Sequence, residues 1–76
     1  MKDILETIIK NLVENKEAIS INEIDGQTTI VYEVKVAEGD MGKVIGKQGK
    51  IANAIRTIMK AVASKEQKKI TIEFIG

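Results

Sequence analysis

The residues with the clearest chemistry are two glycines, three positions apart, that lysines surround. The glycines are Gly46 and Gly49, and the lysines are Lys43, Lys47 and Lys50. Glycine permits backbone conformations and close approaches that a Cβ would prevent. A helix that begins after the second glycine would direct its unpaired N–H groups, and the positive end of its dipole, toward an anion. This combination suits a run of phosphates.

Other phosphate-binding motifs are excluded by their spacing. A P-loop requires G-x-x-x-x-G-K-[ST], and neither Gly42 nor Gly46 begins that pattern. The dinucleotide fingerprint requires G-x-G-x-x-G, and the chain contains no G-x-G. The sequence therefore gives no support for nucleotide hydrolysis. Two glycines at this spacing also occur at simple helix–helix corners. The motif alone therefore does not distinguish a phosphate-binding loop from such a corner, and the rest of the sequence is needed.

Composition excludes several classes of enzyme. The 76 residues include no Cys and no His, so disulfides, zinc sites, thiol nucleophiles and imidazole bases are absent. We expect a non-catalytic protein with no cofactor and no metal. No apolar run approaches the roughly 20 residues of a membrane span, and the chain starts on an amphipathic pattern instead of a signal sequence. We therefore expect a cytoplasmic protein without a membrane partner.

Charge is distributed unevenly along the chain, although the net charge is only +1. Residues 1–40 contain nine acidic side chains and four lysines, whereas residues 41–65 contain six basic side chains and no acid. A basic segment of this length indicates an anionic partner. The alternative explanation is a solvated, lysine-rich helix.

The first half of the chain changes from a helical to a strand period. Residues 3–15 carry one apolar stripe at helical spacing, which predicts a helix. Alternating apolar residues then predict strands over residues 19–24 and 30–36. Asp25 and Gly26 between them fit the positive-φ positions of a tight turn. We predict an antiparallel hairpin.

The second half is predicted to contain two helices and a last strand. We expect Asp40 to cap a short helix from Met41 to Ile45, a longer helix over residues 50–64, and a strand over residues 70–74. The order is α-β-β-α-α-β, in which the helical crossover permits parallel strand pairing. We predict a single α+β domain over the whole chain, with a three-stranded mixed sheet and all three helices on one face.

The predicted helix over residues 50–64 has an apolar arc of roughly 200°, wider than packing on a sheet requires. Part of this arc must face a ligand groove, a second subunit or the first helix. The two edges of the arc are Ala54, Ile58 and Ala61 on one side and Ala52, Met59 and Ala63 on the other. An uncovered edge would be an apolar patch that small monomers rarely expose. We take Ala54, Ile58 and Ala61 as the predicted homodimer interface.

The glycine segment also resembles a known motif. The string Val44-Ile45-Gly46-Lys47-Gln48-Gly49-Lys50-Ile51 is similar to the V-I-G-x-x-G signature of KH domains. The predicted element order resembles the type II, bacterial version of that fold, and over essentially its whole length the chain resembles the small bacterial KH proteins of the KhpA family. The resemblance implies a non-catalytic protein that binds single-stranded RNA and serves as a post-transcriptional regulator or RNA chaperone.

The resemblance also implies which residues touch RNA. KH modules clamp four backbone nucleotides with the G-x-x-G loop. The bases would lie in a groove between the helices and the edge of the middle strand, on a floor of Val44, Ile45 and Ile51, with Asn53 and Arg56 on the walls. The predicted RNA-binding residues are Lys43, Val44, Ile45, Gly46, Lys47, Gln48, Gly49, Lys50, Ile51, Asn53 and Arg56.

Two further implications concern the depth of the groove and the partners of the chain. Many KH signatures have a large aliphatic residue at the position of Ala52, so a shallower groove is expected. Members of this family also form homodimers and pair with a larger KH-containing partner protein. The alternative function is therefore a protein-interaction module with the KH fold, in which RNA binding is weak or incidental.

Overall fold

A computed structural model describes residues 1–76, and its elements follow the predicted order. The helices and strands are α1 (Lys2–Lys10), β1 (Ser20–Asp25), β2 (Thr29–Lys35), α2 (Met41–Ile45), α3 (Lys50–Ser64) and β3 (Lys69–Ile75). Two single-turn 3₁₀ helices, η1 (Lys16–Ala18) and η2 (Glu38–Asp40), and a tight turn, η3 (Lys47–Gly49), in which Gln48 is not helical, complete the chain; the sequence did not predict the two 3₁₀ helices.

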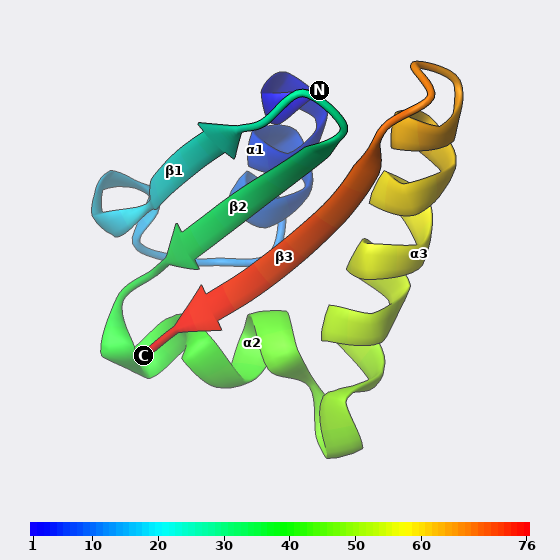
Figure 1. The fold of residues 1–76 in the computed structure, drawn as a ribbon. Helices are drawn as coiled ribbons and strands as arrows, with labels where there is room; N and C mark the ends of the chain where they lie inside the picture. Colours follow the sequence, from blue (N-terminus) through cyan, green and yellow to red (C-terminus); the bar gives the residue numbers. More distant parts are fainter.

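The sheet has the strand order β1-β2-β3 (Figure 1). The β1 and β2 strands form the predicted antiparallel hairpin, and β3 pairs parallel to β2. The predicted mixed sheet with three helices against it is confirmed. Because β2 has a neighbour on both sides, the two free edges of the sheet belong to β1 and β3.

One aliphatic core joins the helices to a single face of the sheet. Alternate residues of β2 are buried on that face, and they meet buried side chains from all three helices and from β3. The core cluster consists of Leu5, Ile9, Val13, Ile30, Tyr32, Val34, Val44, Ile55, Met59, Ala63, Ile70 and Ile72. The phenol of Tyr32 is the one large polar group in this cluster, and it donates a 2.7 Å hydrogen bond to Glu23 Oε1. Burial, together with this bond to an anion, raises the pKa of Tyr32.

Several predicted details of the first half are wrong. The α1 helix ends at Lys10, although a further turn carries the chain to Val13, which is still buried. The hairpin loop spans residues 26–28 and is closed by a 2.8 Å hydrogen bond from Gly26 N–H to the carbonyl of Thr29, the first residue of β2, and Gly26 does not have a positive φ. Ile24 lies on the open face of the sheet and is 51% exposed.

None of the helices is long and apolar enough to cross a membrane.

Candidate nucleic-acid interface

The loop between α2 and α3 has a backbone that requires glycine. Gly46 has φ +75° and Gly49 has φ +76°, and Gln48 between them also lies in the left-handed region at φ +56°. A Cβ on Gly46 would lie 2.6 Å from Ile51 Cγ1, so both the backbone conformation and the packing demand glycine there. A Cβ on Gly49 would meet only Asn53 Nδ2 at 4.0 Å, so only its conformation favours glycine.

The loop presents unpaired positive charge at the start of the longest helix. The side chains of Lys47, Gln48 and Lys50 are all exposed, and neither lysine forms an ion pair within the chain. The positive end of the α3 dipole lies at the same place, because α3 begins at Lys50. The surface that the loop offers therefore favours an anion.

The ammonium group of Lys43, in contrast, already forms ion pairs within the chain. Its Nζ lies 3.0 Å from Glu14 Oε1 and 3.3 Å from Asp40 Oδ1. The hydrogen bond to Glu14 is the main reason that the pKa of Lys43 is raised. Of the three lysines that the sequence placed around the glycines, only Lys47 and Lys50 are therefore available to a ligand without breaking an ion pair.

Asp40 anchors the loop-bearing helix to the distant N-terminal segment. Its side chain is buried, Oδ2 accepts a 2.9 Å hydrogen bond from Asn15 N–H, and Oδ1 accepts a 3.2 Å bond from Glu14 N–H. These bonds, led by the one from Asn15, hold the pKa of Asp40 below its ordinary value. The prediction that Asp40 caps α2 with its side chain is wrong, because the carboxylate is directed at these two backbone donors instead.

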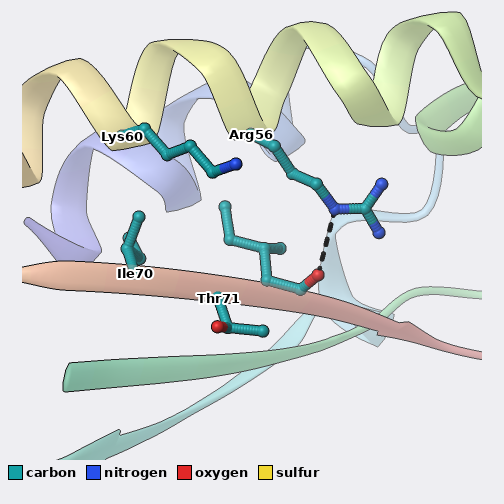
Figure 2. A pocket seen from close by; sticks show the side chains of 5 residues that line it. Arg56, Lys60, Ile70 and Thr71 are labelled. Atoms are coloured by element: carbon teal, nitrogen blue, oxygen red, sulfur yellow. Dashed lines mark hydrogen bonds between the residues drawn. The ribbon is translucent and has the colours of Figure 1, made fainter.

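A groove separates α3 from the free edge of β3, and Arg56 bridges it (Figure 2). Arg56 Nε donates a 3.2 Å hydrogen bond to the outward-facing carbonyl of Ile72, and Nη1 donates a 3.2 Å bond to Asn53 Oδ1. The guanidinium carbon also lies 5.4 Å from the ring centroid of Phe74. Beside Arg56 is a cavity of about 120 Å³. Its lining consists of Arg56, Lys60, Ile70, Thr71 and Ile72.

The position of this groove corrects one expectation. The resemblance placed the groove at the edge of the middle strand, but both edges of β2 are paired, and the free edge beside α3 belongs to β3. The sequence consequently did not predict Lys60 and Thr71, which line the cavity, or Phe74, which lies beside the Arg56 guanidinium. A signal for Lys60 was present, since it follows Asn53 and Arg56 at i+7 and i+4 on one helical face.

The predicted aliphatic floor is not assembled as expected. Val44 is fully buried in the core and contributes nothing to the surface, whereas Ile45 and Ile51 are half-buried. Ile51 lies five residues before Arg56, which is about 140° around the helix, and it packs against Gly46. The structure thus brings Asn53 and Arg56 together at the groove, and places Ile51 on a different face of α3.

The outer face of α3 carries the apolar edge that the sequence assigned to a dimer. Ala54 and Ala61 are exposed, and Ile58 between them is 47% exposed. The opposite edge, made of Ala52, Met59 and Ala63, is buried against the core. No element of the chain covers the first edge, so it is an unpartnered apolar stripe.

Comparison with known proteins is consistent with this architecture. Residues 2–74 match the family model described as "KhpA/KhpB, KH domain". The chain is 55% identical over 75 residues to the RNA-binding protein KhpA of Caldanaerobacter subterraneus subsp. tengcongensis and 53% identical to that of Clostridium acetobutylicum; each alignment covers 99% of this chain and 100% of the relative. It is 45% identical to RNA-binding protein KhpA of Aquifex aeolicus, over 99% of this chain and 95% of the relative. No solved structure gives a significant match.

Proposed function

The chain belongs to the KhpA/KhpB family of KH domains, and from this membership we propose that it binds single-stranded RNA. In this proposal the backbone of the strand lies against residues 46–49, and its bases lie along the groove between α3 and β3. The protein catalyses nothing. It acts in the cytoplasm as a post-transcriptional regulator or RNA chaperone.

One observation carries the proposal. The loop with two positive-φ glycines, Gly46 and Gly49, lies at the end of the groove, and its two exposed lysines have no acidic partner. Glycines let a phosphate backbone approach the chain closely, and Lys47 and Lys50 supply charge that needs no rearrangement to reach it. The names of the relatives, all RNA-binding proteins, support the same ligand.

Within the groove, Arg56 and the edge of β3 would contact the bases. The Ile72 carbonyl faces the groove as an acceptor, and the Arg56 guanidinium offers both a planar stacking surface and N–H donors. The Phe74 ring, whose centroid lies 5.4 Å from the guanidinium carbon, contributes a cation–π contact to Arg56. The chain has only two aromatic residues, so base recognition here would rely on hydrogen bonds and apolar contacts more than on aromatic platforms.

Comparing single-stranded with double-stranded RNA as competitors tests this proposal. An unstructured oligonucleotide should compete for the protein at least tenfold more effectively than a hairpin stem of equal length, because the groove admits splayed bases and not an A-form helix. Competition against one labelled RNA, followed by fluorescence anisotropy, measures the ratio. Equal competition by the two RNAs would show that the groove is not where the bases bind.

We further propose that two copies of the chain associate through the exposed stripe of Ala54, Ile58 and Ala61. Small residues permit close approach of two helices, and a two-fold interface would remove Ile58 from water. Sedimentation at micromolar concentration should give about twice 8.4 kDa for the unmodified chain and 8.4 kDa for Ile58→Glu. Ile24→Glu is the matched control, because Ile24 is equally exposed but lies on the open face of the sheet. A monomeric unmodified chain would contradict the interface.

The same stripe favours the second candidate function, a protein-interaction module. The net charge is only +1, and the α3 stripe could hold a larger KH-containing partner in place of a second copy. The two functions differ in their salt response. RNA binding through lysines weakens steeply with salt, whereas association through an apolar stripe does not.

A further inference from the structure

The groove does not end at Arg56. A second cavity, of about 400 Å³, adjoins the one beside Arg56 and shares Lys60, Ile70 and Thr71 with it. Its remaining lining comes from Lys68 and Lys69, where β3 begins, and from Thr29, the β2 residue that pairs with Lys69. The groove therefore follows the free edge of β3 toward its first residue, away from the glycine loop.

The two ends of this groove are well separated. The glycine loop lies at the first residue of α3, Lys50, and Lys60 lies ten residues later on the same helix. At a rise of about 1.5 Å per residue this places them about 15 Å apart along the helix axis. In Figure 2 the Arg56 side chain reaches from α3 across the gap to the Ile72 carbonyl of β3, and the Lys60 side chain lies in the gap with its ammonium directed toward Arg56. A strand that lies against the loop and continues along β3 must pass both side chains.

The far end of the groove carries charge of one sign. Neither Lys60 nor Lys69 forms an ion pair, and no acidic residue lines either cavity. Lys68 is the exception among the lysines, because it is paired with Asp25 at 3.1 Å. Lys60 also lies more than one turn before the last residue of α3, so the negative end of the helix dipole affects it little.

We propose that Lys60 and Lys69 form a second phosphate site for the same RNA strand, at the end of the groove opposite the glycine loop. This inference rests on the proposed function and extends it. Lysine ammonium groups act as point charges toward phosphate, and this end of the groove offers only one apolar side chain, Ile70, on which a base could rest. The site lengthens the bound segment of RNA and does not select its sequence.

The length of the RNA provides the test. Randomised single-stranded RNAs of four and of eight nucleotides are titrated at salt concentrations from 0.05 to 0.5 M. If two more phosphates are neutralised by the longer RNA, its log–log salt slope should be more negative by about 1.4, at about 0.7 for each phosphate. Lys60→Gln combined with Lys69→Gln should lower affinity for eight nucleotides about tenfold at low salt, change affinity for four nucleotides less than twofold, and abolish the slope difference.

A control variant separates a local site from general attraction. Lys2→Gln combined with Lys35→Gln removes the same charge outside both cavities and should affect both RNAs equally and weakly. An equal loss for both lengths in the Lys60 and Lys69 variant would overturn the second site, as would no loss at all, while the proposed function would stand. Failure of the unmodified chain to bind either RNA would overturn both proposals.

Discussion

Lys47→Asp combined with Gln48→Asp is expected to lower affinity for single-stranded RNA at least tenfold, which is about 1.4 kcal/mol, without changing the fold. Both side chains are exposed and form no ion pair, so the fold loses no contact. Gln48 has φ +56°, a conformation that Asp adopts more readily than most residues. Two carboxylates would then face the phosphates that the loop is proposed to hold. Affinity is measured by anisotropy and the fold by circular dichroism.

A control variant makes the same change of charge outside the loop between α2 and α3. Lys35→Asp combined with Gln27→Asp replaces the same residue types at exposed positions of the hairpin, outside the loop between α2 and α3. This variant should bind RNA within about threefold of the unmodified chain, since charges beyond a Debye length of about 10 Å are largely screened at 0.1 M salt. Equal losses in the two variants would mean that net charge, and not the loop, determines binding.

Asp40→Asn is expected to destabilise the fold more than any other single change of charge. Its carboxylate accepts two backbone N–H groups from a segment 25 and 26 residues away. An asparagine side chain has one acceptor oxygen in place of two, and its NH₂ group would oppose a backbone donor, so one part-buried hydrogen bond is lost inside the fold. We expect the melting temperature to fall by about 10 °C. Asp25→Asn, which removes one exposed ion-pair partner, should shift it by less than about 3 °C.

The same residue gives the stability a pH dependence of known sign. The pKa of Asp40 is lower in the folded chain than its ordinary value, so folding favours the ionised form. Its contribution is therefore complete above the ordinary range of an aspartate and is lost as the pH falls through the folded pKa. The melting temperatures of the unmodified chain and of Asp40→Asn should converge at acidic pH. A constant difference down to pH 2 would contradict the assigned role of the carboxylate.

The local elements could be predicted because their signals are local. The α3 helix runs over the predicted residues, Lys50 to Ser64, because its apolar periodicity is strong and Gly49 precedes it in a left-handed conformation. The short α2 helix ends at Ile45 as predicted, because Gly46 follows it with a positive φ. The parallel pairing of β3 followed from the length and handedness of the helical crossover.

The site could be predicted only in part, because its assembly depends on contacts between distant segments. The α-β-β-α-α-β order does not reveal that the free edge beside α3 belongs to β3, and for that reason Lys60 and Phe74 were not predicted near the groove. The side chain of Asp40 had two possible partners, its own helix and the distant Asn15, and only the folded chain shows that the second prevails. The ion pair of Lys43 with Glu14 could not be predicted for the same reason, because the two residues are distant in the sequence.

The salt dependence of RNA binding by the unmodified chain measures directly whether the loop lysines contact phosphates. If Lys47 and Lys50 neutralise phosphates in the bound state, the logarithm of the association constant for a single-stranded RNA should fall with the logarithm of salt concentration at a slope of about −1.4 or steeper. The slope should be shallower for Lys47→Asp combined with Gln48→Asp, because one lysine contact is gone. Binding that is insensitive to salt, or a slope that the loop substitutions leave unchanged, would contradict the claim that this loop holds the RNA backbone.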